Sequence, residues 1–112
     1  MNNLKKDSEF QKIYNSGKKS FGYYSLIFFK KNDINKKRCG FVVSKKTGNA
    51  VCRNRLKRLF REYYRKNEEK IKDGIDIIFV AKRTAGEKFK VLKYQDIEKD
   101  LNKIFKYAKI FK

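Results

Sequence analysis

The segment from Ala50 to Lys66 can bury its large apolar residues together only as an α-helix. At about 100° per residue, these side chains all fall within about 60° of the first of them, on one side of the helix. They are Leu56, Leu59, Phe60 and Tyr63. The opposite side carries Asn54, Arg58, Arg61 and Arg65. This pattern predicts a helix that packs its apolar side against other elements and leaves a cationic side in solvent.

The N-terminal part of the chain predicts one helix and two strands. A short helix should begin at Ser8, whose spacing to Gln11 fits a capping box, and end near Gly17. Aromatic and β-branched residues then predict a strand over residues 21–30. A second strand is expected over residues 38–45 as its hairpin partner.

The C-terminal part predicts a third strand and a closing helix. After a turn at Asp73-Gly74, residues 75–81 are apolar enough for a central strand, and residues 94–108 carry apolar side chains at helical spacing. The element order α-β-β-α-β-α predicts an α+β fold in which the second and third strands are parallel if they are adjacent. We expect a single domain over residues 1–112, because chains of this length rarely divide.

Positive charge is concentrated around the predicted central helix. The chain has 31 Lys and Arg against 12 Asp and Glu, a net charge of +19, and residues 36–66 hold twelve basic residues and one acidic residue. Such an excess repels itself in a compact fold unless the partner is a polyanion such as a nucleic acid or an anionic membrane surface. Five of the seven Arg lie in residues 53–65, and the guanidinium group offers phosphate a planar fork of donors. The distribution predicts phosphate binding rather than an ordinary solvated surface.

Two further features support nucleic-acid binding more weakly. Lys45 and Lys46 lead into the predicted helix N-terminus, where free backbone N–H groups favour anions. Aromatic residues crowd the first helix and the first strand: Phe10, Tyr14, Phe21, Tyr23, Tyr24, Phe28 and Phe29. Such rings commonly stack on single-stranded RNA, although core packing is the commoner role for any one of them. A strand that is aromatic on both faces indicates that one face is partly open.

Several residue types limit the possible chemistry. The chain has no His, so it lacks the usual general base at neutral pH. Cys39 and Cys52 form no CxxC motif, which argues against a zinc site or a disulfide framework and fits a reducing compartment. Asp73 fits a turn and Asp76 fits the start of a strand, and these roles suit the two carboxylates better than binding a metal ion together. With no apolar run of membrane-spanning length, we expect a soluble cytoplasmic protein.

Residues 44–62 read SKKTGNAVCRNRLKRLFRE. This stretch resembles the signature of the bacterial ribonuclease P protein family, S-K-K-x-G-N-A-V-x-R-N-R-x-K-R followed by x-x-R-E/Q. The resemblance extends to Phe10 followed by Tyr14, to the aromatic strand, to a strand followed by Lys82-Arg83, and to the closing helix. It implies the α-β-β-α-β-α sandwich of that family, whose mixed sheet has a left-handed βαβ crossover, although right-handed crossovers are the general rule.

The resemblance also implies a function: a protein cofactor of a ribozyme. A catalytic RNA subunit with Mg²⁺ would remove the 5′ leader from precursor tRNA, while the protein binds the RNA subunit and the leader and supplies no catalytic residue. The predicted RNA-binding residues are Lys45, Lys46, Arg53, Asn54, Arg55, Lys57, Arg58, Arg61 and Arg65, and the predicted leader cleft is formed by Phe10, Tyr14 and Phe28. Metal sites on the protein stay unknown, and no membrane or DNA is expected as a partner. The family often has Phe at position 14, Tyr at position 28 and Pro at position 84.

Three other functions stay open at this point. A ribosomal or other structural RNA-binding protein would share the basic helix and the fold class. A DNA-architectural protein is disfavoured, because nothing marks a dimer with recognition helices at half-site spacing. A protein-only nuclease would need an acid–base pair or a metal-binding carboxylate set that the sequence does not display.

Overall fold

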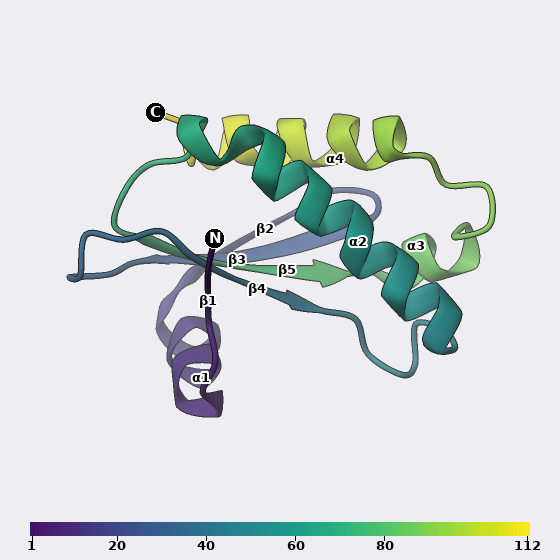
Figure 1. Ribbon diagram of the computed structural model, residues 1–112, viewed down its shortest axis with the longest axis horizontal. Coiled ribbons are helices and arrows are strands. Elements are labelled where there is room, and N and C mark those ends of the chain that lie inside the picture. The colour runs from purple at the N-terminus through teal and green to yellow at the C-terminus, as the bar shows by residue number, and fades with distance from the viewer.

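A mixed five-stranded sheet is the centre of the fold in the computed structural model, which describes residues 1–112 (Figure 1). The strands are β1 (Asn2–Asn3), β2 (Lys18–Phe21), β3 (Ser25–Lys31), β4 (Arg38–Val42) and β5 (Ile75–Ala81), in the spatial order β1-β4-β5-β3-β2. β4 and β5 are parallel, whereas β3 is antiparallel to β5 and to β2. The helices are α1 (Asp7–Ser16), α2 (Ala50–Asn67), α3 (Arg83–Glu87) and α4 (Tyr94–Tyr107), with a 3-10 turn η1 (Glu68–Lys70).

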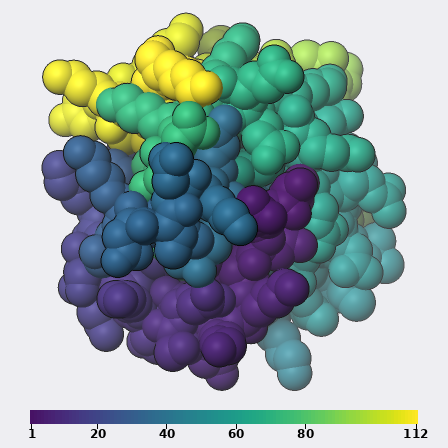
Figure 2. Space-filling model, turned by 60° about the vertical axis from the view of Figure 1, so that its left-hand side comes forward, coloured from purple at the N-terminus to yellow at the C-terminus, as the bar shows by residue number.

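The two faces of the sheet are covered unequally. On one face, α2 and α4 close a large core whose strand residues include Ile27, Ile77 and Phe79. On the other face, α1 covers a small cluster in which Ile13 packs with Ile78. In Figure 2 the purple N-terminal residues and the yellow C-terminal residues lie at opposite sides of the visible surface. None of the helices is long and apolar enough to cross a membrane.

The connection from β4 through α2 to β5 confirms the predicted parallel pair and has the hand that the family resemblance implies. The predicted central helix corresponds to α2 and the predicted third strand to β5, which lies in the middle of the sheet. In Figure 1, α2 lies in front of the sheet, both strand arrows point right, and β5 lies above β4. This crossover is left-handed, against the general preference.

The predicted hairpin is wrong. β5 lies between β3 and β4, so residues 21–30 and 38–45 do not pair with each other. Residues 21–30 are also not one strand, because the chain turns at Gly22–Tyr24 and the true hairpin joins β2 to β3. The short segments β1, β2 and α3 were not predicted, apart from Phe21 at the end of β2.

The cap of α1 also differs from the prediction. Ser8 and Gln11 form no capping box; the Oε1 atom of Glu9 instead accepts hydrogen bonds from the backbone N–H groups of Lys5 (2.9 Å) and Lys6 (3.0 Å). A carboxylate at this position satisfies the backbone N–H groups of the N-cap residue and of the residue before it. The helix therefore begins at Asp7, with Glu9 in its first turn.

A charged cluster ties the start of α1 to the sheet. The guanidinium of Arg38 on β4 donates to Glu9 (2.7 Å) and to both carboxylate oxygens of Asp76 on β5 (2.8 Å each). Asn32 donates a further hydrogen bond to Asp76 (2.8 Å). Asp76 is buried, so these donors stabilise a carboxylate that would otherwise be costly to bury. The cluster links α1 to β4 and to the central strand β5.

Glu9→Gln tests this link through its pH dependence. The backbone hydrogen bonds from Lys6 and Lys5, with Arg38 nearby, lower the pKa of Glu9. A lowered pKa in the folded state stabilises the protein above the unfolded pKa, about 4.3, and this contribution is lost as the pH falls through the folded value. Glutamine keeps an acceptor for the cap but not the charge. At pH 7 we expect the variant to have a lower urea midpoint of unfolding than the parent protein.

The difference between the two urea midpoints should shrink below about pH 4.3 and vanish when Glu9 of the parent is fully protonated. A constant difference across pH 7 to 3 would show that the charge of Glu9 contributes nothing. Asp7→Asn is a matched control, because this exposed neighbour makes no ion pair. It should shift the midpoint little at any pH.

Candidate nucleic-acid interface

Helix α2 begins at a well-defined cap after the Lys-rich loop. The side-chain oxygen of Asn49 accepts a hydrogen bond from the backbone N–H of Cys52 (2.9 Å), which stops the helix from extending backward. Lys45 and Lys46 are exposed in the loop just before this cap. The loop thus places two ammonium groups beside the positive end of the helix dipole, as the sequence predicts.

The cationic side of α2 is exposed over its whole length. Its exposed members, which we call the cationic face, are Asn54, Arg58, Arg61 and Arg65. The helix buries its other side, including Leu56, Leu59, Phe60 and Tyr63, in the core. Lys57 lies half-buried at the border. The angular pattern read from the sequence is therefore confirmed, and it gives guanidinium groups one helical turn apart, about 5 to 6 Å.

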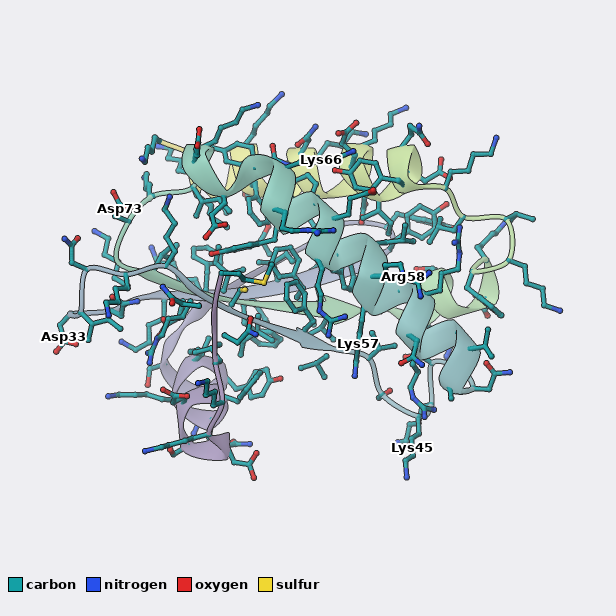
Figure 3. The ribbon with its side chains drawn as sticks, viewed as in Figure 1. Asp33, Lys45, Lys57, Arg58, Lys66 and Asp73 are labelled. Atoms are coloured by element: carbon teal, nitrogen blue, oxygen red, sulfur yellow. The ribbon has the colours of Figure 1, made fainter.

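The arginines of the cationic face have no acidic partners within the protein. The five ion pairs of the molecule include only one on α2, between Lys66 and Glu62 at 3.9 Å. Arg61 instead lies over the ring of Phe41, with 5.5 Å between the guanidinium carbon and the ring centroid. Figure 3 shows Lys45, Lys57 and Arg58 toward one end of the molecule and Asp33 and Asp73 at the other. This segregation leaves a surface with the countercharge that a phosphate backbone needs.

Two of the predicted RNA-binding arginines also hold the protein's own backbone. Arg53 donates to the carbonyl of Gly48 (2.8 Å) in the preceding loop. Arg55 donates to the carbonyls of Phe89 (3.1 Å) and Leu92 (2.6 Å), between α3 and α4. Both side chains are half-buried. Nothing in the sequence indicates these carbonyl partners, and RNA contact by either arginine stays a prediction.

The three aromatic residues of the predicted leader cleft lie together on the opposite face of the sheet. Tyr14 meets Phe28 edge to face at 4.8 Å between centroids, and Phe10 lies 6.4 Å from Tyr14. All three are half-buried. They pack beside Val42 and Val80, which are also half-buried. We call Phe10, Tyr14, Phe28, Val42 and Val80 the aromatic face; it is the partly open sheet face that the sequence predicts.

A glycine sets the position of Phe10. Gly40 lies on β4 beneath the Phe10 ring, and a Cβ atom added there would come 2.6 Å from two ring carbons. No side chain fits at this position without moving the ring. Gly40 therefore allows α1 to approach the sheet closely enough for Phe10 to join the aromatic face.

The remaining reactive groups are poorly suited to chemistry. Burial raises the pKa of the Cys39 thiol to about 12 and also raises the pKa of Cys52, so both stay protonated and weakly nucleophilic near pH 7. Asp76 is held by Arg38 and Asn32. No three acidic or Cys side chains come together in a group that could hold a metal ion. The two faces therefore present positive charges and aromatic rings, and the groups named here are poor candidates for acid–base chemistry.

One exposed aromatic residue near this face was not included in the predicted leader cleft. Phe21, at the end of β2, is 65% exposed and lies on the same side of the sheet as Phe28. The Lys82 ammonium lies 5.5 Å from the centroid of its ring. The crowding of aromatic residues in 21–30 was the available signal, but the strand register was needed to place this ring.

Comparisons with known proteins agree on one family. A family model described as ribonuclease P matches residues 1–109. The ribonuclease P protein component of Fusobacterium nucleatum is 63% identical over 110 residues, which cover 98% of this chain and 99% of that protein. The corresponding component of Clostridioides difficile is 43% identical over 108 residues, which cover 96% of this chain and 91% of that protein.

A solved structure shows the same fold. The RNase P protein of Staphylococcus aureus superposes with a TM-score of 0.87 at 32% identity, covering 100% of this chain and 99% of that one. The mixed sheet and the helix arrangement described above are therefore shared by a protein of that name.

The cationic face predicts a specific salt dependence of RNA binding. Arg58→Ala or Arg61→Ala should weaken binding to a bacterial ribonuclease P RNA without unfolding the protein, since both side chains are exposed. The slope of log K against log salt should become shallower by about one unit for each phosphate that the variant no longer neutralises. Filter binding over a series of salt concentrations would measure it.

Lys31→Ala is the matched control, because it removes the same charge from an exposed position at the end of β3. It should leave the slope unchanged. An equal effect of all three substitutions would mean that net charge alone, and not the cationic face, determines binding.

Proposed function

The chain belongs to the ribonuclease P protein family, and from this we propose that it is the protein subunit of a ribonucleoprotein that removes the 5′ leader from precursor tRNA. The observation that carries the proposal is the pair of faces on either side of β4. Phe41 points to the α2 side, where it lies under Arg61, and Val42 points to the aromatic face. Only the thickness of one strand separates a phosphate-binding surface from a base-stacking surface.

Each face fits one RNA partner. The cationic face and the Lys45–Lys46 loop bind the phosphate backbone of the catalytic RNA subunit, because unpaired guanidinium groups in a row favour phosphates over neutral surfaces. The aromatic face binds the single-stranded leader, since half-open rings can stack unpaired bases. A protein that holds both partners brings the leader to the RNA that cleaves it.

The residues of this chain leave the chemical step to the RNA subunit. There is no His, the thiols are protonated near pH 7, and the buried carboxylate of Asp76 is paired with Arg38. Mg²⁺, held mainly by the RNA, would supply water activation and charge stabilisation at the scissile phosphate. The protein's part is to bind, to position the leader and to neutralise phosphate repulsion.

Reconstitution tests the proposal directly. The protein should restore cleavage of precursor tRNA by a bacterial ribonuclease P RNA at low Mg²⁺, where phosphate repulsion keeps the RNA alone nearly inactive. A gel assay of the released leader measures this stimulation. A structural RNA-binding protein without a catalytic assembly would bind the RNA but give no stimulation, and cleavage by the purified protein without RNA would contradict the assigned division of labour.

Phe28→Ala tests the leader assignment. Loss of one base–aromatic stack should weaken holoenzyme binding of leader-bearing precursor tRNA by roughly 1 to 3 kcal/mol, while binding of mature tRNA stays unchanged. Fluorescence titration of both RNAs measures the difference. Phe28→Tyr, which keeps a ring of similar size, should restore the parent affinity. An equal loss for mature tRNA would reject leader binding at this ring.

A further inference from the structure

We propose that Phe21 is an additional stacking site for a nucleotide of the single-stranded leader, next to the aromatic face. The inference rests on the proposed function, because it extends the leader-binding surface along the same side of the sheet. The ligand is an unpaired nucleotide: a base on the exposed ring and a phosphate beside the neighbouring ammonium groups.

The register of the sheet makes Phe21 continuous with the aromatic face. Phe21 pairs with Leu26 on β3, and Leu26 pairs with Val80 on β5, so these three side chains form one row across the sheet. Phe28 lies in the next row, opposite Lys19 of β2. Phe21 and Phe28 are thus diagonal neighbours on one face, about 7 to 8 Å apart. Leu26 is half-buried and adjoins both rings, so an apolar side chain connects Phe21 to the aromatic face.

The turn that presents Phe21 is held by side chains of α4, of α3 and of the residue between β5 and α3. Asp100 of α4, 8% exposed, accepts hydrogen bonds from the backbone N–H groups of Tyr23 (2.7 Å) and Tyr24 (3.0 Å). Lys82, after β5, donates to the carbonyl of Gly22 (2.9 Å). The hydroxyl of Thr84 on α3 donates to the carbonyl of Tyr23. A ring next to a turn fixed in this way loses little backbone freedom when it binds a ligand.

The exposure of Phe21 and the positive charges near it favour nucleotide binding over a role in core packing. Phe21 is 65% exposed, so most of its ring contributes nothing to burial in the folded protein. Lys82 lies 5.5 Å from the ring centroid, and Lys19 is exposed one row away on the same face. Neither lysine forms an ion pair. An exposed aromatic ring near two lysines without acidic partners matches a base with its neighbouring phosphates.

The test uses the reconstituted holoenzyme and precursor tRNAs whose leaders increase one nucleotide at a time. Phe21→Ala should have no effect on mature tRNA or on the shortest leaders. Once the leader is long enough to pass the aromatic face, the variant should bind about fivefold more weakly, the equivalent of roughly 1 kcal/mol for one exposed stack. Phe21→Trp should bind at least as tightly as the parent. Tyr107→Ala is the matched control, because Tyr107 is 85% exposed on α4, on the other side of the sheet.

Phe28→Ala in the same series separates failure of this inference from failure of the proposed function. If Phe28→Ala shows a leader-dependent loss and Phe21→Ala shows none at any length, the Phe21 site is wrong and the leader assignment stands. If neither variant shows a leader-dependent loss, both are wrong. A loss with Phe21→Ala that is equal for mature tRNA would place the ring against the RNA subunit or another partner and overturn the inference.

Discussion

The ring of Phe79 is the contact on which the positions of the functional surfaces depend. It lies on β5, the central strand, and its centroid is 5.2 to 5.8 Å from the rings of Phe41 on β4, Phe60 on α2 and Phe105 on α4. Tyr64 of α2 adds an edge contact at 6.1 Å. Packing of this kind is close and specific. Because α2 is held through two of its residues, its rotation about its own axis is fixed, and its arginines can only face solvent.

That arrangement explains how a chain with a net charge of +19 folds with few ion pairs. The strong attractions within the protein are concentrated in one cluster, where Arg38 joins Glu9 and Asp76 and fixes α1. The arginines of the cationic face form no ion pair within the protein. Mutual repulsion across the cationic face destabilises the free protein, and binding of a polyanion relieves it. In the proposed assembly, the electrostatic repulsion that opposes folding also favours RNA binding.

The sequence predicted the parts of the fold that depend on local periodicity. The span of α2, its buried side and the central strand β5 follow from residues near one another in the chain, and the structure confirms them. The hairpin was wrong, because β5 enters the sheet between two strands that precede it by more than 30 residues. The turn that divides residues 21–30 depends on Asp100, which is 77 residues from Tyr23. The left-handed crossover came only from the family resemblance, since general topology favours the opposite hand. Local sequence patterns also could not predict that Arg55 donates to the backbone carbonyls of Phe89 and Leu92.

Strand β4 determines how the two proposed RNA-binding surfaces relate to each other. Side chains alternate across a strand, so Phe41 supports Arg61 on one side while Gly40 and Val42 belong to the other side, under Phe10 and in the aromatic face. A rigid strand leaves little freedom between the surfaces. In the proposed assembly, binding of the RNA subunit to α2 therefore fixes the direction in which the leader runs across the sheet. Stacking on rings accepts any base, so this geometry selects a leader by its position relative to the RNA subunit and only weakly by its sequence.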